Sequence, residues 1–218
     1  MKKVLSHIYH NYYKNVFPDY PMELNNVVGD IDTLLDIGCG DNSPVQFLPS
    51  HIHKVGVDIF QPSIESSKKK KIHSEYVKLN VLEVADYFDE SSFDCAVASD
   101  LIEHLEKKDG HELIRQMEKV AKKRIVIFTP NGFLKQGEYN QNPWQVHHSG
   151  WNPKEMEEMG FRVYGINGLK ILRGEFSRIR YRPYLFWRVI SDFTQLFLKN
   201  KPEYSFQMLC VKEIESTT

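Results

Sequence analysis

Two short groups of residues in this chain have the types and spacing that chemistry requires. The first is the turn Gly38-Cys39-Gly40, which has Asp36 two residues ahead of it. Glycines let the backbone bend sharply and leave no side chain in a ligand's way, while a carboxylate accepts hydrogen bonds or faces a cationic group. The second is Glu103-His104, an acid beside a side chain that exchanges protons near neutral pH. These residues indicate a small-ligand site with a candidate base.

Apolar strands that alternate with helices must position both groups. Helical stretches separate five apolar runs, which predict strands at 34–37, 54–59, 75–79, 92–99 and 124–129. That order is typical of a parallel sheet with right-handed crossovers. A helix is expected directly after the glycine turn, because Ser43 suits the N-cap and Pro44 the first helical position. The turn would then offer free backbone N–H groups to a ligand at the edge of the sheet.

The second half of the chain adds a polar, aromatic loop at 133–151 and a helix from Asn152 to Gly160. Strands follow at 161–166 and 206–212, and an insertion at 167–205 separates them. The insertion holds five arginines, namely Arg173, Arg178, Arg180, Arg182 and Arg188.

After these arginines, residues 184–198 predict a helix that is apolar on more than one face, unlike a lone surface helix. Three interpretations stay open for this helix. It docks on the domain or on a second copy of the chain, it lies on a membrane surface, or it caps an anionic or lipid-like acceptor.

The sequence Leu35-Asp36-Ile37-Gly38-Cys39-Gly40 resembles the first motif of class I S-adenosylmethionine-dependent methyltransferases. Glu103-His104-Leu105, after the fourth strand, is similar to the small-molecule members of that family. The resemblance implies an α/β fold: a doubly wound, Rossmann-like, seven-stranded sheet whose last strand is antiparallel, between the fifth and sixth. It also implies that S-adenosylmethionine is the cofactor. The methyl group would pass in line to an acceptor that is small or lipid- or sugar-like, with an anionic group as one option.

The expected cofactor contacts lie along the ends of the first four strands. Asp58 ends the second strand, where a carboxylate accepts hydrogen bonds from ribose hydroxyls. After the third strand the resembling family usually has an acid that accepts from the adenine amino group, and here Asn80 offers its carboxamide oxygen. The full set of expected contacts is Asp36, Gly38, Cys39, Gly40, Asp58, Ile59, Asn80, Val81 and Ser99.

For catalysis, His104 is the leading candidate base, Glu103 would orient it or face solvent, and His147 could reach the same cleft from the loop. The other interpretation is that His104 only packs against the cofactor. No metal ligand is assigned. A metal-dependent alternative would use Asp100, Glu103 and His104 with His147 or His148. It resembles a Glu-x-x-Glu-His pattern with a later His in some RNA 3′-end methyltransferases, with Asp100 replacing the first Glu.

Composition narrows the function classes. The net charge of -1 argues against a globally steered nucleic-acid binder, and the Asp/Asn-Pro-Pro-aromatic motif of DNA amino-methyltransferases is absent after the fourth strand, so no DNA partner is expected. The three cysteines are far apart, so neither a disulfide framework nor a thiolate zinc site is expected. No apolar run approaches the length of a membrane span, and a cytoplasmic location is expected.

One domain is expected over 1–218, made of an aromatic N-terminal lid at 1–30, a cofactor-binding core at 31–166, the helical insertion at 167–205 and the last strand at 206–212. The expected partners are a small-molecule acceptor and, through 184–198, a membrane surface or a second copy. Two other functions share the early motifs: a non-catalytic nucleotide-binding protein of the same fold and an NAD-dependent oxidoreductase. Ser43 in place of a third glycine, together with Asp36 inside the strand, weighs against the oxidoreductase.

Overall fold

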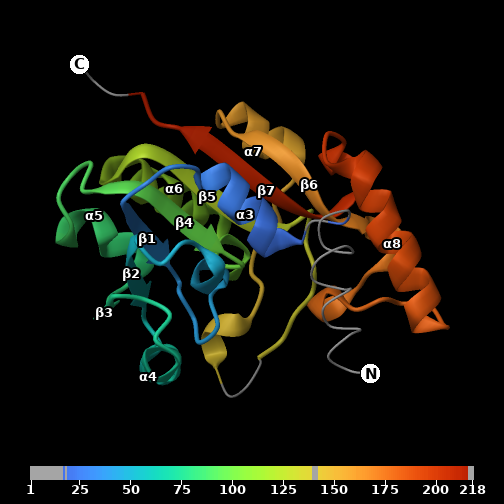
Figure 1. Ribbon diagram of the computed structural model, residues 1–218, viewed down its shortest axis with the longest axis horizontal. Helices are drawn as coiled ribbons and strands as arrows, with labels where there is room; N and C mark the ends of the chain where they lie inside the picture. The colour runs from blue at the N-terminus through green and yellow to red at the C-terminus, as the bar shows by residue number, and fades with distance from the viewer. Residues whose placement is uncertain (1–16, 18, 139–141, 216–218) are drawn as a thin grey trace.

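The computed structural model describes residue 17, residues 19–138 and residues 142–215. They form a seven-stranded sheet in the order β3-β2-β1-β4-β5-β7-β6 (Figure 1). The strands are β1 (Thr33–Ile37), β2 (His53–Asp58), β3 (Glu75–Lys78), β4 (Phe93–Ser99), β5 (Ala121–Pro130), β6 (Arg162–Leu169) and β7 (Ser205–Glu213). The α-helices are α3 (Tyr20–Val28), α4 (Gln61–Lys70), α5 (Val84–Tyr87), α6 (Lys107–Val120), α7 (Pro153–Glu158) and α8 (Tyr184–Leu198).

The first five strands are parallel, and β7 lies antiparallel between β5 and β6. This arrangement confirms the predicted doubly wound sheet and the predicted position of the last strand. The order of the strands reverses beside β1, because β2 pairs with one side of it and β4 with the other. In open α/β sheets, ligands bind at such a reversal, outside the carboxyl ends of the strands.

Alternating side chains give the sheet two apolar faces. Along β5, Ile125 and Ile127 belong to one core, whereas Val126 and Phe128 belong to the other. Helices α5, α6 and α7 contribute to the first core and α3 to the second. Figure 1 shows α3 across the middle of the sheet and α8 beyond its β6 edge. The sheet is therefore covered on both faces around the strand ends that carry the candidate site.

The full helix predicted after Ser43 is wrong, because the chain forms only the short 3-10 helix Pro44–Phe47. The Ser43 hydroxyl does accept a hydrogen bond from the N–H of Val45. The helix stops because Pro49 follows Leu48, and a residue before proline is biased toward extended backbone. Leu48 has a ψ of 157°, as that bias requires. A tight connection, rather than a long helix, thus leads from β1 toward β2.

The two accessory segments are described to different extents. Of the lid predicted at 1–30, residues 1–16 and 18 lie outside the described residues, and α3 is the described helix of this segment. The insertion contains α8, which packs along β6. No helix in the described part of the chain has both the length and the apolar character that crossing a bilayer demands.

Candidate cofactor and acceptor site

The glycine turn at the end of β1 makes its hydrogen bonds inside the protein. The Gly38 and Cys39 N–H groups both donate to the Val57 carbonyl, at 2.8 and 2.9 Å. The Gly40 N–H donates to the Asp58 carboxylate at 2.8 Å. The prediction that this turn offers free N–H groups is therefore wrong for these three, because the neighbouring β2 supplies acceptors for them. The turn therefore sets the course of the backbone beside the ligand space, and these three N–H groups are not available to a ligand.

The two glycines differ in what surrounds them. Both have the positive φ that favours glycine, +71° at Gly38 and +56° at Gly40. A Cβ atom at Gly38 would meet a Leu101 methyl at 2.7 Å, whereas nothing lies within 4 Å of a Cβ atom at Gly40. Gly40 also lines a cavity of about 280 Å³ together with Phe60 and Gln145. Packing therefore requires glycine at position 38, and glycine at position 40 leaves room for a ligand.

Asp58, at the end of β2, ties this turn to the segment that follows β2. One carboxylate oxygen accepts from the Gly40 N–H, and the other accepts from the Phe60 N–H at 2.8 Å. Burial raises the pKa of the Asp58 carboxyl, and the backbone hydrogen bonds partly oppose that rise. Each oxygen can accept a further hydrogen bond, so both remain available to a ribose. Ile59 follows directly and is half-buried.

Asp36 lies beneath the turn in a buried ion pair. Its carboxylate is 2.8 Å from Nε2 of His73, and the two side chains are 1% and 0% exposed. The Nδ1 atom of His73 is 3.4 Å from the Ser67 hydroxyl. Asp36 thus supports the turn through a histidine that no sequence motif singled out. A direct contact between Asp36 and the cofactor stays a prediction.

Asn80 already uses its carboxamide oxygen as a helix cap. That oxygen accepts from the Leu82 N–H at 3.1 Å and begins the 3-10 helix Val81–Glu83, in which Val81 is buried. Because a carboxamide oxygen has a second lone pair, the predicted bond from an adenine amino group stays a prediction.

Ser99, at the end of β4, is joined to α3 by a short hydrogen bond with the Tyr20 hydroxyl. The Tyr20 ring stacks on Phe128 with the ring centroids 3.6 Å apart. The described helix of the predicted lid therefore does reach the carboxyl edge of the sheet. Nothing in the sequence distinguished Tyr20 from the other aromatic residues of that segment.

Three candidate catalytic side chains lie close together: Glu103 and His104 follow β4, and His147 comes from the loop after β5. One ligand-type atom from each of Glu103, His104 and His147 lies within 4.8 Å of the others. His148 points elsewhere, because its Nδ1 atom is 3.6 Å from Glu106 and its side chain is half exposed. Of the two loop histidines named from the sequence, only His147 joins this cluster.

Backbone carbonyls fix both clustered histidines. Nδ1 of His104 is 3.1 Å from the Val146 carbonyl, and Nδ1 of His147 is 2.6 Å from the Leu134 carbonyl. A carbonyl only accepts, so Nδ1 carries the proton of each neutral ring and Nε2 keeps its lone pair. Burial is the main cause that lowers the pKa of His104 to about 4, and burial also lowers the pKa of His147. Val146, rather than Glu103, orients His104.

Two acids lie beside the histidines, Glu103, which is buried, and Asp100, which is exposed to solvent. Glu103 accepts a hydrogen bond from Thr129 at 2.9 Å, and Asp100 accepts one from Gln207 at 3.1 Å. Desolvation in the cavity raises the pKa of the Asp100 carboxyl to about 7, and burial together with repulsion from Asp100 raises the pKa of Glu103. Among the described residues, neither carboxylate forms an ion pair with a protein cation. Gln207 comes from β7, which no motif had linked to the site.

These groups share a cavity of about 450 Å³. It is lined by Tyr20, Asp100, Glu103, His104 and His147, by apolar residues such as Phe128 and Leu134, and by Phe176 and Ser177 of the insertion. Gln145 lines this cavity and also the cavity beside Gly40. The site therefore has two neighbouring spaces, one beside the glycine turn and one beside the histidines.

Residues 35–128 match a family model described as a methyltransferase domain. These residues therefore make up a methyltransferase domain. The family model and the shared fold support S-adenosylmethionine as the cofactor, and the matched residues include the glycine turn, Asp58 and the Glu103-His104 pair but not the insertion. Comparison with curated protein sequences gives no match.

Solved methyltransferase structures share the fold of this chain at low sequence identity. An S-adenosylmethionine-dependent methyltransferase from Archaeoglobus fulgidus has a TM-score of 0.57 and 19% identity, over 94% of this chain and 99% of that chain. Phosphoethanolamine N-methyltransferase 2 from Haemonchus contortus has a TM-score of 0.58 and 14% identity, over 94% of this chain and 56% of that one. A small RNA methyltransferase has a TM-score of 0.54 and 16% identity, over 90% and 25%. Because the names of these neighbours point to very different substrates, the comparison does not identify the methyl acceptor of this chain.

Proposed function

We propose that this methyltransferase acts on a small acceptor bound in the cavity lined by His104. S-adenosylmethionine supplies a methyl carbon that its sulfonium already activates, so the protein mainly has to align the two reactants. The observation that carries the proposal is the shared wall: Gln145 lines both this cavity and the one beside Gly40.

The residues beside the glycine turn suit the cofactor. Gly40 has open space where a side chain would stand, and Asp58 has unused acceptor capacity beside it. In this proposal Asp58 holds the ribose, Asn80 accepts from the adenine, and Ser99 borders the cofactor near Tyr20. Asp36 acts from below, through His73, to hold the turn in shape.

His104 acts on the acceptor. With a pKa of about 4 it is neutral at pH 7, and because Nδ1 carries the proton toward Val146, Nε2 is the ring atom that would accept a proton. A base this weak suits an acceptor that loses its proton only as the methyl group transfers. The cavity combines apolar walls such as Phe128 and Phe206 with amides such as Gln136, which favours a small, lipid-like or sugar-like acceptor.

Incubation with labelled S-adenosylmethionine and fractionated cell extract tests this function. Release of S-adenosylhomocysteine together with one labelled small molecule is the expected result, and His104→Gln should slow that release without weakening cofactor binding. His148→Gln is the matched control, since His148 lies outside the cluster. Cofactor binding without turnover on any fraction would favour a non-catalytic binding protein instead.

A second candidate mechanism uses a divalent cation, and the convergence of Glu103, His104 and His147 favours it. Carboxylate oxygens and imidazole nitrogens bind Mn²⁺, Fe²⁺ or Zn²⁺, and a carbonyl on the second ring nitrogen is the usual support for a metal-binding histidine. A cation there would also neutralise the buried Glu103 and the neighbouring Asp100. It would polarise an acceptor hydroxyl, which would compensate for the weak basicity of His104.

Dialysis against a chelator separates the two mechanisms. Activity that disappears and returns with one added cation supports the metal, whereas full activity in chelator removes it. Calorimetry with Mn²⁺ and no cofactor adds a second readout, in which Glu103→Gln should abolish binding. Glu106→Gln, a nearby exposed acid, should leave metal binding unchanged.

A further inference from the structure

Helix α8 has its polar face toward the protein and its apolar face toward solvent. Ser191 and Gln195 are buried against the sheet edge. The Gln195 amide donates to the Gly165 carbonyl at 2.7 Å and accepts from the Gly168 N–H at 2.8 Å. An ordinary surface helix has the reverse arrangement. Hydrogen bonds of Gln195, with the buried Leu198 at the end of the helix, therefore hold α8 on β6.

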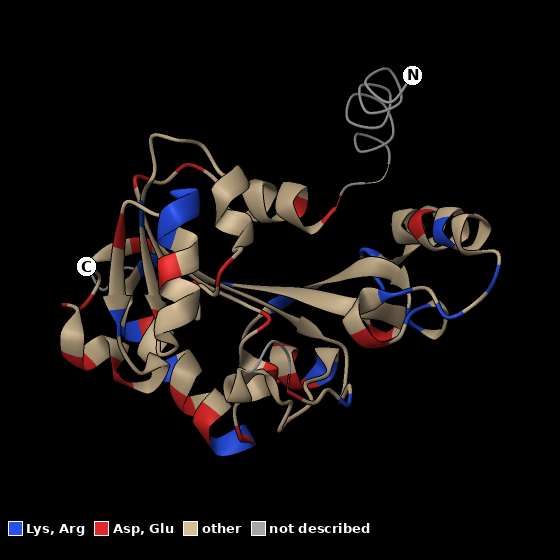
Figure 2. Cartoon of the chain, turned by 90° about the horizontal axis from the view of Figure 1, so that it is seen from below, with Lys and Arg blue, Asp and Glu red and all other residues tan. Residues whose placement is uncertain are grey.

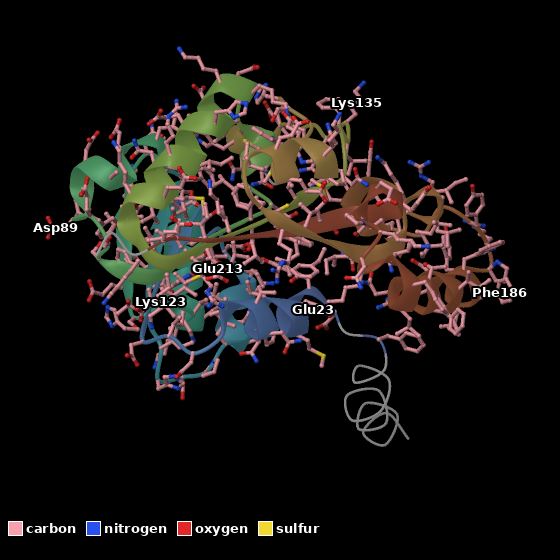
Figure 3. The ribbon with its side chains drawn as sticks, turned by 90° about the horizontal axis from the view of Figure 1, so that it is seen from above. Glu23, Asp89, Lys123, Lys135, Phe186 and Glu213 are labelled. Atoms are coloured by element: carbon pink, nitrogen blue, oxygen red, sulfur yellow. The ribbon has the colours of Figure 1, made fainter. Side chains whose placement is uncertain are left out.

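Large apolar side chains cover the outer face of α8. Leu185 is 76% exposed and Phe197 63%, and Figure 3 shows Phe186 at the outer end of the helix, away from the body of the protein. The other exposed apolar residues of this face are Tyr184, Val189, Phe193 and Leu196. A contiguous exposed apolar face of this kind marks an interaction surface.

Positive charge borders this face. Between residues 173 and 201 the sequence has seven Lys and Arg residues and two acids, whereas the whole chain has a net charge of -1. The exposed members next to the apolar face are Arg178, Arg180, Arg182 and Arg188. Figure 2 shows the basic segments on the loop that leads into α8. Any partner must therefore accept apolar side chains and positive charge together.

We propose that the α8 face docks on an anionic membrane surface. Aromatic and aliphatic side chains with flanking arginines are what an interfacial helix presents to acyl chains and anionic headgroups. A second copy of the same face would bring one arginine border against another, so charge complementarity favours the bilayer over a homodimer.

Docking there would place the acceptor cavity beside the bilayer. A cavity of about 650 Å³ lies at the start of α8, lined by residues that include Arg178, Arg188 and Leu185. It shares Phe176 and Ser177 with the cavity of His104. This inference rests on the proposed function: the acceptor would be an anionic amphiphile whose headgroup passes from the arginine cavity to the catalytic one.

Co-sedimentation of the whole chain with phosphatidylcholine vesicles, with and without phosphatidylglycerol, tests the docking. We expect binding only to the anionic vesicles, and loss of binding in high salt. Replacing Arg178, Arg180 and Arg182 together by Gln should weaken binding by at least about tenfold, as should Phe193→Ser with Phe197→Ser. The matched control replaces Lys68, Lys69 and Lys70 of α4 by Gln, which removes the same charge elsewhere and should leave binding unchanged.

Three outcomes would overturn the docking. One is no binding of the parent protein to anionic vesicles, and another is an equal loss in the lysine control. The third is a stable dimer in sedimentation velocity that the two phenylalanine substitutions dissociate, because the face would then belong to a second copy. Calorimetry with S-adenosylmethionine on the same samples keeps the proposed function separate, since cofactor binding should persist in every variant.

Discussion

Replacing Asp58 is the sharpest test of the cofactor site, because the structure gives this carboxylate two duties. It accepts from the backbone at Gly40 and Phe60, and in the proposed function it also accepts from the ribose. A hydrogen bond to a charged group contributes about 1.5–3 kcal/mol. Asp58→Ala should therefore weaken S-adenosylmethionine binding roughly 10- to 150-fold at 25 °C.

The structure changes the expectation for Asp58→Asn. The sequence alone suggests that this variant loses less affinity, since one acceptor oxygen remains. Both carboxylate oxygens face backbone N–H groups, however, so the amide nitrogen must point at either the Gly40 or the Phe60 N–H. We therefore expect Asp58→Asn to lose about as much affinity as Asp58→Ala, and thermal unfolding should show a small stability loss in both.

Asp94 is the matched control for this experiment. Its carboxylate also accepts backbone hydrogen bonds, from Asp32 at 2.8 Å and Thr33 at 3.3 Å, but at the start of β1 rather than its end. Asp94→Ala should lower stability and leave cofactor affinity unchanged in isothermal titration calorimetry. If the Asp58 variants bind the cofactor as tightly as the parent, Asp58 only ties two turns together and the proposed ribose contact is wrong.

Three further predictions concern the same edge of the sheet. Gly40→Ala should weaken cofactor binding in calorimetry and lower stability by about 1–2 kcal/mol, because alanine disfavours the positive φ. Gly38→Val should lower the melting temperature far more, because its side chain would also clash with Leu101. With a pKa of about 4, well below its ordinary 6.5, His104 should lower turnover only as pH approaches 4. Asp100 titrates near 7 in the same cavity, so the decisive variant is Asp100→Asn, and a midpoint near 6.5 that persists in it would contradict the buried base. His73→Ala should destabilise the fold by about 3–5 kcal/mol in urea unfolding, because it leaves Asp36 buried and unpaired, and a loss under 1 kcal/mol would show that water reaches the pair.

Local patterns were enough to predict most of the fold. Apolar runs and capping residues act over a few positions, and they located all seven strands and the start of α7 at Asn152. The antiparallel last strand followed only from the family resemblance. The error after Ser43 has a local cause too, since Pro49 ends the helix before its first full α-turn.

The site was predictable only where its residues follow a strand end. Gly38, Asp58 and His104 were predicted that way, and the structure places all three at this edge, because the carboxyl ends of parallel strands meet there; their roles stay predictions. The sequence did not single out His73, Tyr20 or Gln207, because each contacts a residue far away along the chain. His73 and Asp36, for example, are 37 residues apart. A local pattern holds no information about such pairs.

Helix α8 departs from the usual pattern of a surface helix, and the proposed membrane docking gives that departure a functional reason. A sequence that specifies one structure buries its apolar faces, so a helix that exposes Leu185, Phe193 and Phe197 while hydrogen-bonding through Gln195 conflicts with that rule. Proteins usually break such sequence–structure rules at functional sites, where residues are selected for binding a partner or ligand. The conflict lies in the segment that the methyltransferase family model does not match, and that segment adjoins the acceptor cavity through Phe176. In the proposed function the matched residues hold the cofactor, and the unmatched ones are where acceptor specificity should be sought.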